Sequence, residues 1–278
     1  MPDRSPVVRR LELGKELRDV RERAGLDIKD IAKELRWDVS KVSRLENGTR
    51  TISALELDRV MERCGVSGDR AARIDTLAQG ARKRGNYGRV QDWARSYVGL
   101  EEAAAELLIH YGALVPGILQ TEAYARSLLE QFFTVRVEDV DEIAKNRVRR
   151  RERLNAAEPP ELSVVLGEPA VLGVVGDGDV MREQLQLLLD AARLKHVTLQ
   201  VLPLSNWAHP ALGSSFTMLR LDDPEKTLVY LEDMTNADYL AGSHHVETYS
   251  LAFNRLRVTA LNEQDSAALI REALENFP

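Results

Sequence analysis

The chain has 278 residues, of which 44% are hydrophobic and 29% are charged, and its formal net charge is -6. This composition is typical of a globular protein with a substantial buried core, and it excludes both a disordered chain and a membrane-embedded one. A single cysteine, Cys64, excludes an intrachain disulfide framework and a zinc site made of several cysteines. The first residues contain no apolar segment of signal-peptide length, so we expect a cytoplasmic protein that binds no membrane.

Charge is divided unevenly along the chain. Residues 1–90 contain 21 Lys and Arg and 15 Asp and Glu, which gives a net charge of +6, whereas the remaining residues have a net charge of -12. This asymmetry predicts a basic module that can face a polyanion, followed by an acidic module that cannot.

Five short helices are predicted within residues 1–85, which we interpret as one domain. Gly25 ends the first helix, and Asp27 and Asp38 are suited to cap the second and third. Ser53 begins a capping box ahead of the fourth, and the fifth follows to about the end of the domain. The apolar positions expected on these helices are Leu13, Leu17, Val20 and Ala24; Ile28, Ile31, Ala32 and Leu35; Val39, Val42 and Leu45; Leu57, Val60, Met61 and Cys64; and Ala72, Leu77 and Ala81.

A linker is predicted over residues 86–98, next to the turn-rich GNYG, and a mixed α/β domain over residues 99–278. A strand, helix, strand order predicts a partly parallel sheet with a hairpin after it, so the fold class is α+β overall: an all-α five-helix domain followed by a domain with a small sheet. The expected elements are helices over 100–113, 121–133, 138–154, 180–194, about 236–256 and 263–276, and strands over 162–166, 197–202, 215–221 and 227–231.

The stretch LGKELRDVRERAGLDIKDIAKELRWDVSKVSRLENGTRTIS contains two short helices joined by a tight turn. It resembles the XRE helix-turn-helix domain of Cro and phage repressors nearly position by position. The resemblance implies that residues 38–47 form a recognition helix for double-stranded DNA. It places Ser40, Ser43 and Arg44 at base edges, where Arg44 can span guanine O6 and N7 with two donors.

The same resemblance implies contacts to the DNA backbone. It assigns these to Lys41, Asn47, Thr49 and Arg50.

The resemblance also implies a structural ion pair between Arg21 and Glu46, and the sequence departs from the family pattern at two nearby positions. Ile28 replaces a Gln that usually contacts phosphate, which removes one expected contact. Arg36 replaces the usual Gly of the turn, so we expect a turn without a positive φ angle.

The chain after the first domain contains YVGLEEAAAELLIHYGALVPGILQTEAYARSLL, residues 97–129, in which Pro116-Gly117 predicts a tight turn and Thr121 a helix cap. This part resembles the C-terminal domain of unknown function of a large group of actinobacterial XRE regulators, some of them antitoxin-like and many encoded beside a small partner protein. Five arginines lie in RVRRRERL, residues 147–154. They predict either a solvated or internally paired face, or a surface for phosphates or an acidic partner.

No constellation of catalytic or metal-binding residues is recognisable in the sequence. Only His244 and His245 are close among the five histidines, and the glycines of LGVVGDGD lack a nucleotide-binding pattern. Glu168, Glu232 and Asp233 are isolated acids that can orient a ligand, although surface roles are more common for such residues. We therefore expect no enzyme, no cofactor and no metal.

These patterns predict a sequence-specific transcriptional regulator that is cytoplasmic and associates with the nucleoid when bound to DNA. One such domain covers few base pairs, so we expect a homodimer on a palindrome with half-sites about 34 Å apart. The C-terminal domain would sense a small-molecule effector or a protein partner. The alternative is an antitoxin-like protein that binds a small partner protein and regulates its own gene.

Overall fold

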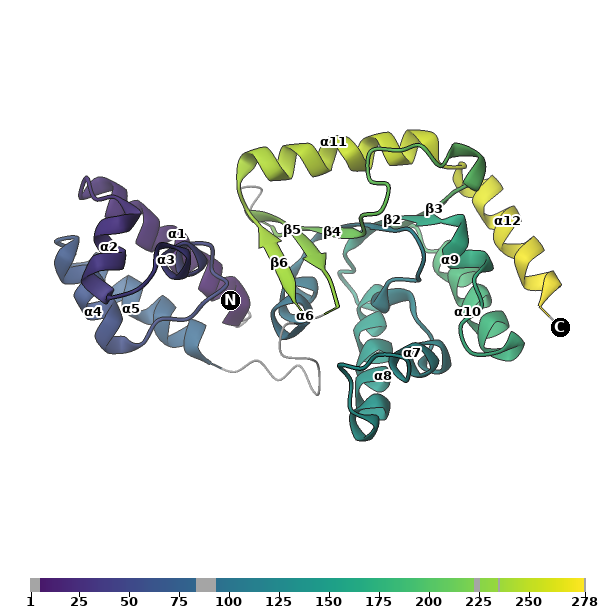
Figure 1. Ribbon diagram of the computed structural model, residues 1–278, viewed down its shortest axis with the longest axis horizontal. Coiled ribbons are helices and arrows are strands. Elements are labelled where there is room, and N and C mark those ends of the chain that lie inside the picture. The colour runs from purple at the N-terminus through teal and green to yellow at the C-terminus, as the bar shows by residue number, and fades with distance from the viewer. Residues whose placement is uncertain (1–5, 84–93, 223–225, 235, 278) are drawn as a thin grey trace. The chain divides into compact units, whose positions relative to one another are not determined.

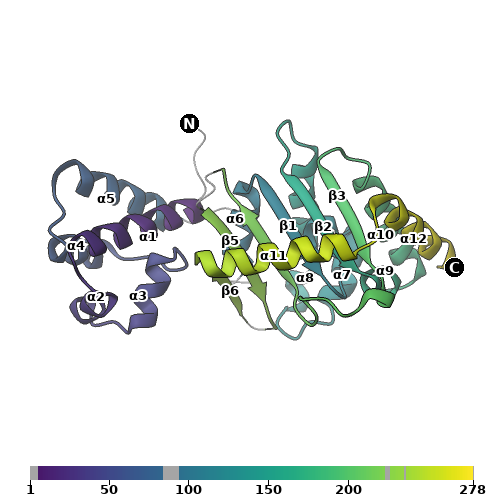
Figure 2. The same ribbon diagram turned by 90° about the horizontal axis from the view of Figure 1, so that it is seen from above.

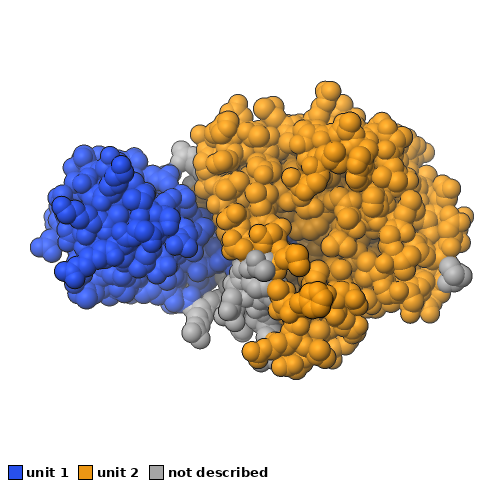
Figure 3. Space-filling model, in the orientation of Figure 1, with its two compact units in different colours: residues 1–86, 96–103 blue, residues 87–95, 104–278 orange. Residues whose placement is uncertain are grey.

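The computed structural model describes residues 6–83, 94–222, 226–234 and 236–277. Contacts divide the chain into two compact units (Figure 3): unit 1 comprises residues 1–86 and 96–103, and unit 2 comprises the rest. The predicted boundary motif GNYG lies outside the described residues. Residues 99–103, which were predicted within the second domain, group with unit 1.

Unit 1 is all-helical and confirms the five predicted helices. Asp27, Asp38 and Ser53 cap helices as predicted, and the boxes at Asp27 and Ser53 are completed by Asp30 and Glu56. The helices are α1 (Pro6–Arg23), α2 (Ile28–Leu35), α3 (Val39–Glu46), α4 (Ala54–Arg63) and α5 (Gly68–Arg82), and most of α6 (Ala94–Ala103) groups with them.

Most of the expected apolar positions form the core of unit 1, with a few corrections. Ala24 and Ala72 are exposed, and Val39 is 41% exposed. Ile74 and Ala78 lie on the inner face of α5 together with the predicted Leu77 and Ala81, so the prediction for that face was wrong at Ala72 only. Cys64 is only half-buried, and burial raises the pKa of its thiol. The fully buried core comprises Leu13, Leu17, Val20, Ile31, Ala32, Leu35, Val42, Leu45, Ile52, Leu57, Val60, Ile74, Ala78 and Ala81.

Unit 2 is built on a six-stranded sheet with the order β3-β2-β1-β4-β5-β6. Strands β1, β2 and β3 are parallel, whereas β4, β5 and β6 continue the sheet in antiparallel pairs, which confirms the predicted parallel part and hairpin. The strands are β1 (Glu106–Tyr111), β2 (Glu161–Gly167), β3 (Val197–Leu202), β4 (Phe216–Arg220), β5 (Thr227–Glu232) and β6 (Ala237–Leu240).

Helices cover both faces of this sheet. Helix α11 (Ser243–Thr259) runs across one face, and α7 (Glu122–Leu129), α8 (Val137–Arg151) and α10 (Gly178–Ala191) lie on the other (Figures 1 and 2). Helix α12 (Glu263–Asn276) packs against α10 and β3. The short elements are η1 (Gly117–Leu119), η2 (Glu152–Asn155), α9 (Glu168–Leu172) and η3 (Leu204–Asn206).

Two predicted helices of unit 2 were partly wrong. The expected helix over 100–113 ends at Ala103, and the central strand β1 follows it. Leu107, Leu108, Ile109 and His110 are all buried. A strand buried on both faces has no apolar-polar alternation and reads like a buried helix. Similarly, the expected helix over about 236–256 begins with β6, and α11 starts only at Ser243.

Candidate nucleic-acid interface

The turn between α2 and α3 is set by Arg36, contrary to the sequence-based expectation. Arg36 has φ 56° and ψ 40°, which is the left-handed conformation, so the prediction of a turn without positive φ was wrong. The Arg36 and Trp37 N–H groups donate to carbonyls of the last turn of α2, Trp37 to Ala32 O at 2.8 Å. These hydrogen bonds satisfy groups that a helix end leaves free, and they hold a side chain in a geometry that glycine normally provides.

Arg21 and Glu46 fix α3 to α1 through a buried ion pair. Arg21 Nε lies 2.6 Å from Glu46 Oε1, and both residues are more than nine-tenths buried. The hydrogen bond to Glu46 raises the pKa of Arg21 above its ordinary value. Gly14 allows this close approach, because a Cβ there would lie 2.5 Å from the Glu46 carbonyl oxygen. The pair is therefore structural and holds α3 in place.

The three residues predicted at base edges all belong to α3, but they differ in how exposed they are and in which hydrogen-bonding groups they leave free for DNA. Arg44 is exposed, and its guanidinium forms no ion pair with any residue that the structure describes. Ser43 is half-buried. The Ser40 hydroxyl donates to Asp38 Oδ1, the same oxygen that caps Lys41 N–H, and these hydrogen bonds lower the pKa of Asp38. Ser40 can still accept a hydrogen bond, but its donor is occupied within the helix.

Trp37 organises the cations beside α3, a role that sequence reasoning missed. Lys41 Nζ lies 3.8 Å from the centre of a Trp37 ring and Arg50 Cζ lies 5.3 Å from it, both within cation-π range. The indole N–H donates to Glu56 Oε1 at 3.1 Å. Burial opposes ionisation of Glu56, but hydrogen bonds from Ser53 and Trp37 outweigh it and lower its pKa. The feature of the sequence that could have indicated this role is a tryptophan in an otherwise polar turn.

The remaining predicted backbone-contact residues end α3. Asn47 Oδ1 accepts a hydrogen bond from Arg18 Nη2 at 2.7 Å, which leaves the Asn47 amide N–H groups as donors. The Thr49 hydroxyl donates to the Arg44 carbonyl at 3.0 Å. Gly48 has φ 73°, and a Cβ there would lie 2.7 Å from Leu11 Cα, so only glycine fits between Asn47 and Thr49. Arg18 was not anticipated from the sequence.

The arginine-rich segment of unit 2 is largely directed inward. Arg147 Nη1 donates to Gln120 Oε1 at 2.5 Å, Arg151 Nη1 to the Gln120 carbonyl at 3.1 Å, and Arg153 Nη2 to the Ala104 carbonyl at 2.5 Å. Arg151 and Arg153 thus join α8 and η2 to neighbouring backbone, and Arg147 joins α8 to the Gln120 side chain.

The isolated acids of unit 2 are also engaged. Glu168 Oε2 accepts from Leu204 N–H at 2.6 Å, and Glu232 Oε2 accepts from the Tyr230 hydroxyl at 2.7 Å. No group of three or more potential metal ligands was found among the described residues. Within the same part of the chain, no helix is long and apolar enough to cross a membrane.

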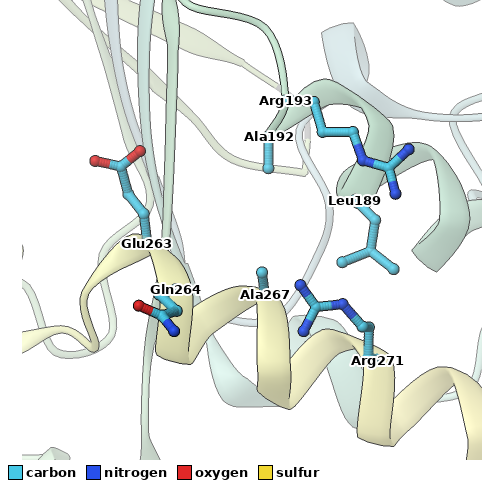
Figure 4. Close-up of a pocket in the computed structure, with 7 residues that line it drawn as sticks. All are labelled: Leu189, Ala192, Arg193, Glu263, Gln264, Ala267 and Arg271. Atoms are coloured by element: carbon cyan, nitrogen blue, oxygen red, sulfur yellow. The ribbon is translucent and has the colours of Figure 1, made fainter.

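A shallow pocket of about 260 Å³ lies between α10 and α12 (Figure 4). Leu189 and Arg193 line one wall, and Glu263, Ala267 and Arg271 line the other. Arg193, in the turn after α10, has a side chain that is 77% exposed and lies 3.4 Å from Asp190 Oδ1, so it is a weakly held cation.

Comparison with known families agrees with this geometry. A family described as a helix-turn-helix domain matches residues 12–74, which places the chain in the class of helix-turn-helix DNA-binding regulators. The domain of unknown function DUF5753 matches residues 94–272. Because this second match spans more than half of the chain, the protein belongs to the DUF5753 family. No curated protein and no solved structure matched.

Proposed function

We propose that the protein is a sequence-specific transcriptional regulator in which α3 reads the major groove of DNA. The observation that carries the proposal is the group of cationic side chains on the outer side of α3 and in the loop after it. There, Arg44 is exposed without an ion pair among the described residues, and Lys41 and Arg50 lie around Trp37. The buried Arg21–Glu46 pair supplies a rigid base for this surface.

The contacts divide into those that specify sequence and those that position the protein. Arg44 would donate two hydrogen bonds to a guanine, with Ser43 beside it, whereas Ser40 would act as an acceptor. Lys41 and Arg50 would contact phosphates, which add affinity but little sequence information. The N–H groups of Asn47 would do the same.

A titration of labelled DNA from upstream of the gene, followed by fluorescence anisotropy, tests this proposal. We expect Arg44→Gln to weaken binding roughly tenfold to hundredfold and to relax the preference at one base pair. Arg59→Gln, an exposed arginine on α4, is the matched control and should bind like the wild type. Equal binding by the wild type and Arg44→Gln would remove Arg44 from the interface.

We also propose that the regulator binds as a homodimer. A single recognition helix covers few base pairs, so specificity requires two half-sites about one helical turn, roughly 34 Å, apart. Sedimentation of the protein with a short operator should give two chains per duplex. One chain per duplex at saturation would contradict the dimer.

A second candidate function is that of an antitoxin-like protein that holds a small partner. The turn after α7 and the first residue of α8 favour it, because Phe133 is 100% and Val137 is 86% exposed in the acidic part of the chain, residues 91–278. Glu138 is exposed beside them, and Asp139 is half-buried. An apolar tip with acidic neighbours suits a small basic protein. Co-expression with the product of an adjacent small gene should give a complex that Phe133→Ser weakens, whereas loss of DNA binding alone would leave this complex intact.

We place the protein in the cytoplasm, on the nucleoid when it is bound to DNA, and we assign it no catalytic activity and no cofactor. Unit 2 would receive the regulatory signal, either a small molecule or a protein partner.

A further inference from the structure

Val39, the first residue of α3, is an apolar side chain on a polar surface. The other two apolar residues of this helix, Val42 and Leu45, are 1% and 2% exposed, whereas Val39 is 41% exposed. Within the described part of unit 1, Val39 is not among the hydrophobic side chains that form the core or pack against it. Core packing therefore does not account for a valine at this position.

Val39 lies on the side of α3 that carries the candidate base contacts. Residues four apart are neighbours on a helix surface, so Val39 lies beside Ser43, and Ser40 lies beside Arg44. The two pairs form adjacent rows. Recognition helices contact base edges through their N-terminal residues, and Val39 is at the N-terminal end of α3. Its side chain would therefore meet a base edge when α3 lies in the major groove.

The end of α3 that carries Val39 is held by a helix cap. Asp38 Oδ1 accepts hydrogen bonds from the Lys41 N–H at 2.7 Å and from the Ser40 hydroxyl. A valine in a helix has one strongly preferred rotamer, because its side chain branches at Cβ. Val39 therefore presents two methyl groups in a fixed direction, and it has no donor or acceptor with which to read a polar base edge.

The major groove offers one apolar group to such a side chain. Guanine, adenine and cytosine present hydrogen-bond donors and acceptors there, whereas thymine adds a C5-methyl group. Contact between this methyl group and Val39 would remove apolar surface of both from water. A polar base edge against Val39 would instead lose hydrogen bonds to water without replacing them. The chemistry of Val39 therefore favours thymine.

We propose that Val39 is a specificity-determining residue that contacts the C5-methyl group of a thymine in the operator. Val39 and Arg44 are five residues apart, which is about 7.5 Å along a helix axis. Base pairs are stacked about 3.4 Å apart, so this thymine lies about two base pairs from the guanine that Arg44 reads. The inference rests on the proposed function, because it names a part of the DNA sequence that α3 would select.

Replacing single thymines by deoxyuridine tests the contact, because this change removes only the methyl group from the DNA. The probe is the shortest duplex that the full chain recovers from random-sequence DNA, and its Kd is measured by fluorescence anisotropy. In the wild type, deoxyuridine at one thymine should raise the Kd about threefold to fourfold, as expected for one buried methyl group. We expect that thymine to lie about two base pairs from the position at which Arg44→Gln relaxes the preference.

Val39→Ala shows whether this side chain makes the contact. We expect the variant to bind the thymine duplex at least about threefold more weakly than the wild type does, and to bind the thymine and deoxyuridine duplexes equally. Because Val39 lies outside the core, Val39→Ala should not lower the melting temperature. Leu55→Ala is the matched control, since Leu55 of α4 is 65% exposed, and it should keep the preference for thymine over deoxyuridine.

The outcomes separate this inference from the proposed function. Wild-type binding that is insensitive to deoxyuridine at every thymine would overturn the inference and leave the regulator in place, as would an unchanged preference for thymine in Val39→Ala. A lowered melting temperature of Val39→Ala with equal loss of affinity for both duplexes would assign Val39 to folding and also overturn it. Recovery of no duplex by the folded wild type would contradict the proposed function, and this inference with it.

Discussion

Arginines of the two units are used in opposite ways. Arg44 and Arg50 of unit 1 are exposed beside α3, whereas Arg147, Arg151 and Arg153 of unit 2 donate hydrogen bonds to amide and carbonyl oxygens of neighbouring segments. The denser basic run is thus the more internal one. A cluster of arginines in a sequence therefore does not by itself indicate a polyanion-binding surface, because the guanidinium groups can donate to oxygens of the same unit.

Glu46→Ala should have the largest effect on stability, because it removes the partner of a buried arginine of unit 1. It leaves Arg21 buried without its carboxylate, and we expect the stability of unit 1 to fall by about 3–5 kcal/mol. Denaturant unfolding followed by hydrogen exchange in α1 and α3 measures this. Arg23→Ala, on the exposed side of α1, should change stability by less than about 0.5 kcal/mol. Comparable effects of the two variants would show that the internal pair is not special.

The stability of unit 2 should also depend on pH, through the buried side chain of His110. Its Nδ1 donates to the Val165 carbonyl at 3.0 Å, and burial lowers its pKa from 6.5 to about 4. Because the folded-state pKa is the lower one, stability is full above about pH 6.5 and falls as the pH drops toward 4, by on the order of 3 kcal/mol. We expect the free energy of unfolding to fall less over this pH range in His110→Asn, which keeps the hydrogen-bond donor. In the exposed His244→Gln it should fall as much as in the wild type. Parallel curves for wild type and His110→Asn would exclude His110 as the source.

Arg151 and Arg149 provide a comparison within one helix. Arg151 donates to the Gln120 carbonyl, whereas Arg149 is exposed on α8. Arg151→Gln should therefore lower the stability of unit 2 by about 1–2 kcal/mol, and Arg149→Gln should change it little. Thermal unfolding of both variants measures the difference in stability. An equal loss of stability in the two variants would mean that the hydrogen bond of Arg151 does not stabilise unit 2.

Arg36→Gly should change stability the least, and it should raise stability rather than lower it. Arg36 has a positive φ, so glycine should relieve strain and stabilise unit 1 by about 0.5–1 kcal/mol. Chemical denaturation measures the gain. Destabilisation by this variant would mean that the Arg36 side chain makes a contribution larger than the strain.

The sequence predicted the local features well because their causes are local. Asp27, Asp38 and Ser53 cap helices through groups only a few residues away, and Thr121 caps α7 in the same way. Strand β1 was mistaken for a helix because its burial on both faces depends on strands distant in sequence. The remote environment, not the segment itself, determines its structure.

The candidate interface was predictable in part. The resemblance located α3 and its polar side, but contacts of Ser40, Ser43 and Arg44 with DNA stay predictions. The left-handed Arg36 could not be foreseen, since nothing in a sequence marks a non-glycine residue that accepts this conformation. Trp37 was missed because its role depends on side chains brought to it by two other segments, Arg50 after α3 and Glu56 in α4.

The most direct test of the central claim is a crossed measurement on Arg44→Gln and Arg151→Gln, with operator affinity and unfolding free energy determined for each. The structure predicts that Arg44→Gln loses roughly tenfold to hundredfold in affinity at unchanged stability, and that Arg151→Gln loses stability at unchanged affinity. Loss of operator affinity by Arg151→Gln with wild-type binding by Arg44→Gln would contradict the assignment of α3 as the DNA-reading helix.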